Sequence, residues 1–118
     1  MVKLMALLLA GLGNSVMAME NPLLIKSCNV AYQPVQGDDP TRALLDVYRP
    51  ADAVHAPVLL FWHGGALMRG DKQLVTGLAR ALAEQGIVVV AANHRLSPAV
   101  QHPVHLQDAA VAVSWVKN

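Results

Sequence analysis

One short stretch organises the chain, and it reads Val58-Leu59-Leu60-Phe61-Trp62-His63-Gly64-Gly65-Ala66-Leu67-Met68-Arg69-Gly70-Asp71-Lys72. It opens with an apolar, largely β-favouring run, which is typical of a strand buried on both faces. The run ends at two consecutive glycines, which let the backbone bend sharply and let another group approach it closely. Asp71 is a suitable helix N-cap, and an apolar helical pattern follows it. The stretch therefore predicts a strand, a tight glycine loop and a helix, with backbone N–H groups free to point at an anion.

Two kinds of chemistry use such a loop. Residues 65–70 match G-x-x-x-x-G, but a phosphate-binding P-loop continues with Lys and then Ser or Thr. Here Asp71 and Lys72 follow, so a carboxylate stands where the phosphate-binding lysine belongs, which argues against phosphate. The second chemistry is an oxyanion hole for acyl transfer, made of backbone N–H groups. An ordinary strand-to-helix turn, with His-Gly-Gly present by chance, is the remaining alternative.

The sequence before this stretch predicts two strands. Residues 23–32 and residues 43–48 are rich in apolar and β-branched side chains, and residues 34–40 between them have the composition of a turn. Together these segments predict an antiparallel hairpin.

The sequence after the glycine loop predicts a βαβ unit. Residues 72–85 form a helical pattern, and residues 87–92 are wholly apolar, as in a strand buried on both faces. The strands at 58–63 and 87–92 should then be parallel, with a right-handed crossover. A further helix is predicted at 104–117. The predicted apolar faces are Leu74, Val75, Leu78, Ala79 and Leu82 on the first helix, and Leu106, Ala109, Ala110, Val113 and Val116 on the second.

The glycine loop resembles the HGGG-type loop of α/β-hydrolase esterases, in the hormone-sensitive-lipase, feruloyl-esterase and kynurenine-formamidase-like groups. The resemblance rests on His63-Gly64-Gly65-Ala66, with Trp62 before it and Gly70-Asp71-Lys72 after it. It implies that Gly65 and Ala66 donate their backbone N–H groups to the tetrahedral oxyanion, while His63 and Gly64 support the loop. Alanine at the last position keeps the N–H and adds only a methyl group.

Other segments match the same esterase groups. They are Leu45-Asp46-Val47-Tyr48 with Pro50, the run Asn93-His94-Arg95-Leu96-Ser97-Pro98, and Asp108 followed by Trp115. The resemblance covers residues 45–118 and implies the N-terminal half of an α/β-hydrolase fold, truncated before the nucleophile elbow. In that fold, strand 58–63 lies between strand 87–92 and the strand that leads into the elbow.

The sequence lacks the nucleophile motif from which a catalytic triad of this fold would be built. An enzyme of this fold needs G-x-S-x-G, then an acid, then a histidine, and G-x-S-x-G does not occur in the sequence. We therefore expect a fragment of a longer serine hydrolase acting on small carboxylic esters, or a truncated reading frame, with no activity of its own and no cofactor. The alternatives are a noncatalytic interaction protein on the same fold, and an amidase or peptidase.

The N-terminus predicts export. Lys3 and the apolar run that follows it, ending in Val16-Met17-Ala18, are typical of a secretory signal peptide over residues 1–18. The hydrolase-like domain would then occupy residues 19–118, in a secreted or periplasmic protein without stable membrane insertion. A misplaced start codon, with Met19 as the true start, is the alternative. The net charge of +1 gives no electrostatic reason to expect a nucleic-acid partner.

Two further side-chain groups have open interpretations. His102-x-x-His105, with His94 nearby, lacks the helix-borne glutamate of the zinc proteases, so solvated or capping histidines are the default and no metal is predicted. Arg95 and Asp108 form either an ion pair beneath the oxyanion loop or ordinary surface charges. Only a buried pair would matter for stability.

Overall fold

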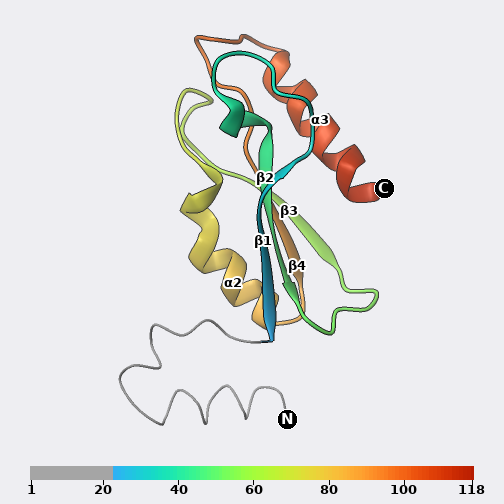
Figure 1. Cartoon of the computed structure of the whole chain (residues 1–118). Helices are drawn as coiled ribbons and strands as arrows, with labels where there is room; N and C mark the ends of the chain where they lie inside the picture. The colour runs from blue at the N-terminus through green and yellow to red at the C-terminus, as the bar shows by residue number, and fades with distance from the viewer. Residues whose placement is uncertain (1–22) are drawn as a thin grey trace.

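A four-stranded mixed sheet forms the centre of the computed structural model, which describes residues 23–118 (Figure 1). The predicted signal peptide lies outside these residues. The strands are β1 (Leu24–Ala31), β2 (Leu44–Pro50), β3 (Val58–Trp62) and β4 (Val88–Ala92), in the spatial order β1-β2-β4-β3. The helices are α2 (Thr76–Glu84) and α3 (Val104–Lys117), and two short 3₁₀ turns precede β2 and α2, η2 (Pro40–Ala43) and η3 (Lys72–Val75).

The strand pairing agrees with the sequence. β1 and β2 form the predicted antiparallel hairpin, and β3 and β4 are parallel and joined through α2 as a βαβ unit. β2 joins the two parts by pairing antiparallel with β4. The predicted hairpin followed by a parallel βαβ unit is therefore confirmed, and β3 lies at the edge of the described sheet.

The helices α2 and α3 cover opposite faces of the sheet (Figure 1). Side chains along each strand alternate between the two faces, so neighbouring residues of one strand pack against different helices. On β4, Val89 and Ala91 pack with α2, whereas Val90 and Ala92 pack with α3. On β2, Tyr48 packs on the side of α2 and Leu45 packs on the side of α3, and neither side chain is exposed. A three-layer α/β/α arrangement follows.

Two burial predictions were wrong in part. β3 is not buried on both faces, since Val58 and Leu59 remain 50% and 40% exposed at the edge of the described sheet. On η3 and α2, Val75, Ala79 and Leu82 pack on the sheet as predicted, but Leu74 and Leu78 are exposed.

The predicted face of α3 was mostly wrong. Leu106, Ala110 and Val113 are exposed, and the helix instead buries His105, Asp108 and Ala112. The physical reason is that His105 and Asp108 have polar partners beside the sheet, Ser97 and Arg95, which make their burial favourable. Hydrophobic periodicity does not detect such partners.

A buried ion pair fastens the start of η3 to the sheet. Lys72 Nζ lies 2.9 Å from Asp46 Oδ1 and donates to Asn29 Oδ1 at 2.8 Å, and both charged side chains are nearly inaccessible. Asp46 Oδ1 also accepts the backbone N–H of Asn29 at 2.8 Å. The β-bulge between Ser27 and Val30, where Asn29 has φ 56°, makes this contact available.

Removing one member of this pair should be strongly destabilising. Lys72→Met leaves the Asp46 carboxylate buried without its cation, which costs about 3–5 kcal/mol of unfolding free energy. Lys72→Met combined with Asp46→Leu should recover most of that loss, because no charge is left unpaired. Urea denaturation measures both effects, with the exposed Lys117→Met as a control expected to change stability by less than about 0.5 kcal/mol. A loss below about 1 kcal/mol for Lys72→Met would contradict this assignment.

Candidate active site

The glycine loop between β3 and η3 adopts an unusual backbone. Gly65 and Gly70 have φ 134° and 108°, and the non-glycine residues Ala66 and Leu67 have φ 57° and 62°. A Cβ at Gly65 would overlap the Arg69 carbonyl, and one at Gly70 would overlap the His63 ring and the Gly64 carbonyl. Both glycines are thus required by close packing as well as by their backbone angles.

The loop leaves two backbone donors available. The Gly65 carbonyl accepts from the N–H groups of Met68 and Arg69, which closes the turn. The N–H groups of Gly65 and Ala66 make no hydrogen bond with any acceptor in residues 23–118, and Ala66 is exposed. Two adjacent free donors at a bend can bind an anion. Their role as oxyanion donors stays a prediction.

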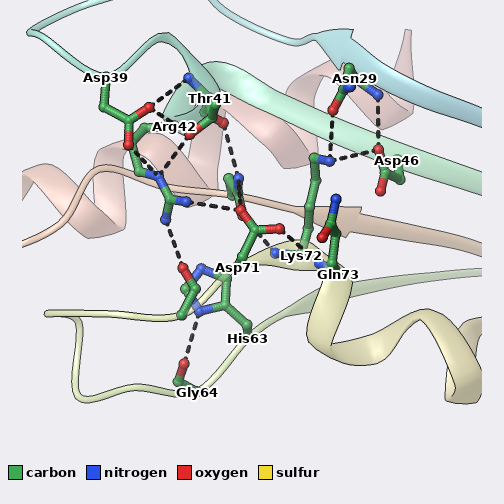
Figure 2. A network of polar contacts seen from close by, with 12 residues as sticks. Asn29, Asp39, Thr41, Arg42, Asp46, His63, Gly64, Asp71, Lys72 and Gln73 are labelled. Atoms are coloured by element: carbon green, nitrogen blue, oxygen red, sulfur yellow. Dashed lines mark hydrogen bonds and ion pairs between the residues drawn. The ribbon is translucent and has the colours of Figure 1, made fainter.

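The far end of the loop is held by side chains from the rest of the fold (Figure 2). Arg42 donates to the Gly70 carbonyl at 3.0 Å and pairs with Asp71 at 3.0 Å. Asp71 also caps η3 through the Gln73 N–H at 2.9 Å, so the predicted N-cap is confirmed. Burial alone would raise the pKa of Asp71, but its hydrogen bonds from Gln73 and Asn93 hold it below the ordinary value.

The near end of the loop is held by a stack of imidazoles. His63 is buried, its Nδ1 lies 2.8 Å from the Gly64 carbonyl, and its ring stacks on His94 with centroids 4.8 Å apart. His94 in turn meets the edge of His105, with centroids 6.0 Å apart. The contact with Gly64 is consistent with the supporting role predicted for His63.

The second segment brought to the site is the loop after β4. Arg95 binds Asp108 through Nη2 at 2.7 Å and through Nε at 3.0 Å, and its backbone N–H donates at 2.9 Å. Asp108 is 1% exposed, so the interpretation as a buried ion pair is confirmed and that as surface charges is wrong. Burial would raise the pKa of Asp108, but the hydrogen bonds from Arg95 outweigh it and keep the pKa low.

Several positioning residues were not predicted from the sequence. Arg42 had no assigned role, and Lys72 and Asn93 were noted only as a helix start and as members of segments that resemble the esterase groups. Each makes long-range contacts, so no local pattern indicates them. Within residues 23–118 no three His, Cys, Asp or Glu side chains are grouped closely enough to hold a metal ion, and no helix there is long and apolar enough to cross a membrane.

His94 should make stability depend on pH. Burial lowers the pKa of His94, and the neighbouring His63 and Arg42 lower it further, against the raising effects of the Arg95 backbone hydrogen bond and Asp108. The unfolded chain therefore binds more protons than the folded chain once the pH falls below about 6.5.

We expect the unfolding free energy to decrease as the pH falls from 7.5 to 5.5, with a slope of up to about 1.4 kcal/mol per pH unit for each proton. His94→Tyr removes this titration and should flatten the dependence. Urea denaturation at three pH values measures it, and an unchanged slope in His94→Tyr would show that other groups are responsible.

The family comparison agrees with this geometry. Residues 45–118 match the BD-FAE family model, a span that includes the glycine loop, the Arg95–Asp108 pair and both helices. Among curated relatives, Esterase LipC of Mycobacterium tuberculosis is 39% identical over 85 residues, which cover 69% of this chain and 21% of that protein. Gibberellin receptor GID1A of Arabidopsis thaliana is 31% identical over 93 residues, which cover 74% of this chain and 26% of that protein.

Solved structures give the same result. Esterase B from Lactobacillus rhamnosis superposes with a TM-score of 0.70 at 27% identity, covering 98% of this chain and 37% of that one. The same esterase inhibited by a tributyrin phosphonate superposes with a TM-score of 0.69 at 29% identity, covering 80% of this chain and 30% of that one. Compared with Esterase LipC and the gibberellin receptor GID1A, the chain spans about a fifth to a quarter of the length of each protein. It belongs to the BD-FAE family, and its fold is that of the N-terminal part of the α/β-hydrolase esterases and lipases.

Proposed function

We propose that residues 23–118 form the oxyanion-binding part of a hydrolase that acts on small carboxylic esters. The observation that carries this proposal is the pair of unpartnered N–H groups of Gly65 and Ala66 on a loop fixed at both ends. The esterase names of several relatives support it.

In this proposal the chain supplies charge stabilisation and the nucleophile comes from elsewhere. Attack on an ester carbonyl turns its oxygen into an oxyanion, and the two N–H groups donate hydrogen bonds to it. His63 and Arg42 act as positioning residues, because they bind the Gly64 and Gly70 carbonyls on either side of the bend that carries the donors. The nucleophile, acid and base would lie in polypeptide beyond these 118 residues, since G-x-S-x-G does not occur in the sequence.

A second candidate is binding without turnover on the same fold. The similarity to a protein named as a gibberellin receptor favours it, since the matched region includes the glycine loop. The two candidates differ in whether the free donors stabilise a transition state. A loss of turnover when one donor is removed distinguishes them.

The donor assignment can be tested by atomic substitution. In a chimera in which this chain replaces the matching segment of Esterase B, Ala66 is replaced by lactic acid, which exchanges the N–H for an ester oxygen. Loss of one oxyanion donor costs about 10²–10³ in kcat. Hydrolysis of a short activated ester measures the loss.

The matched control is Ala66→Gly, which keeps the N–H and permits φ 57°, and it should retain turnover within a few-fold. Proline is unsuitable there, because its fixed φ would also reshape the loop. A folded chimera that turns over ester equally well with lactic acid at position 66 would contradict the assignment. So would a folded chimera that shows no hydrolysis at all.

We also propose that the protein is exported after cleavage behind Ala18. The charge of Lys3 and the short apolar run that follows it support this proposal. Expressed in a bacterial host, the mature chain should begin at Met19 and be found outside the cytoplasm. Mass spectrometry of the N-terminus measures this, and an exported chain that still begins at Met1 would contradict it.

A further inference from the structure

Three buried imidazoles lie in contact beside the glycine loop. His63 stacks on His94 with an angle of 16° between the ring planes, and His94 meets the edge of His105. Histidine is the side chain whose charge ordinarily changes between pH 5 and 8. A charge on a buried ring is unfavourable, so a change of pH can displace a ring of this stack if that ring has somewhere to go.

The His63 ring contacts the glycine loop at both of its ends. Its Nδ1 lies 2.8 Å from the Gly64 carbonyl, and a Cβ at Gly70 would overlap both this ring and the Gly64 carbonyl. The ring and the two glycines are therefore closely packed, and the bend at Gly65 and Ala66 lies in the chain between those glycines. A displacement of the His63 ring changes what the backbone at Gly64 and Gly70 packs against.

His94 can take up a proton and has room to move. A carbonyl only accepts, so the hydrogen of the neutral His94 ring lies on Nδ1, which donates to the Arg95 carbonyl at 2.7 Å, and Nε2 holds the lone pair. His94 also lines a pocket of about 350 Å³, where the side chains of Leu67 and Leu106 are 50% and 65% exposed. This pocket gives a charged His94 ring room to move towards water.

The surroundings of His94 disfavour its charged form. The titratable and charged groups around it are His63 of the glycine loop, Arg42 of η2, Arg95 of its own loop, and His102, His105 and Asp108 at the start of α3. Burial is the largest cause that lowers the pKa of His94, and His63 and Arg42 lower it further. Asp108 acts in the opposite direction, but its carboxylate is already bound by the Arg95 guanidinium. A protonated ring is therefore more stable where water reaches it than in the stack.

We propose that protonation of His94 releases the glycine loop. The charged ring leaves the stack for the pocket, His63 loses the ring on which it packs, and the backbone at Gly64 and Gly70 changes conformation. The loop is thus fixed at neutral pH and loosened in acid. This switch concerns the shape of the loop, and it does not depend on whether the loop serves ester hydrolysis.

The test follows His94 and the loop in one pH titration by NMR. In the full chain labelled with ¹³C and ¹⁵N, the His94 Cε1–H shift reports protonation, and the cross-peak between the His63 ring and the Gly70 α-protons reports their contact. This cross-peak should weaken by roughly half when half of His94 is protonated, because a two-state loop follows the population of its trigger. The amide shifts of Val88 and Val89 in β4 should stay native over this range.

Two results of the titration would overturn the proposal. One is a cross-peak that keeps its intensity while His94 becomes protonated, since amide shifts near a new charge can arise from its field alone. The other is a loss of the cross-peak together with a change at Val88 and Val89, since that is unfolding of the whole domain and not release of the loop.

Two variants assign the effect to one imidazole. His94→Phe keeps a ring for the stack and cannot be charged, so its cross-peak between His63 and Gly70 should persist throughout the titration. His102→Asn is the matched control, because His102 lines the same pocket and is exposed, and it should leave the response of the unaltered chain unchanged.

A response that persists in His94→Phe, or disappears in His102→Asn, would assign it to another group and overturn the proposal. If His94→Phe fails to fold, the coincidence of the two signals in the unaltered chain and in His102→Asn still decides the proposal.

Discussion

The side chain of Asn93 joins the segments on which the candidate site depends. It follows β4, is wholly buried, accepts from the backbone N–H of Lys72 at 2.8 Å, and donates to Thr41 and Asp71 at 3.0 and 3.1 Å. Its own backbone N–H donates to Leu44, and its carbonyl accepts from the Tyr32 hydroxyl at 2.7 Å. One residue thus fixes the end of β4, the turn before β2 and the end of the glycine loop relative to one another.

This arrangement divides the loop into a fixed part and an exposed part. The residues that begin and end it, His63 and Asp71, contact the interior, whereas the bend at Ala66 faces solvent. Ion pairs provide much of this fixation, namely Lys72 with Asp46, Arg42 with Asp71, and Arg95 with Asp108. The pair of Lys72 with Asp46 is nearly inaccessible on both sides, so it is costly to break singly and favours one arrangement of the loop over others.

The sequence allowed the elements and their order to be predicted because strands and helices depend on local patterns. The glycine loop, the cap at Asp71 and the βαβ unit all come from neighbouring residues. The face of α3 could not be predicted in this way, since His105 and Asp108 are buried by partners ten or so positions away. The role of Asn93 was equally hidden, because its amide contacts segments 21 to 52 positions distant.

The left-handed backbone of Ala66 has a consequence for the entropy of the proposed oxyanion binding. Alanine in this region costs roughly 1–2 kcal/mol, which glycine would avoid, yet alanine also has far fewer backbone states than glycine in a free loop. A loop with glycine at that position as well would sample more shapes, and an arriving anion would have to order them. With Ala66 at φ 57°, the proposed oxyanion loop would meet that ordering cost once, during folding, and not again each time an anion binds.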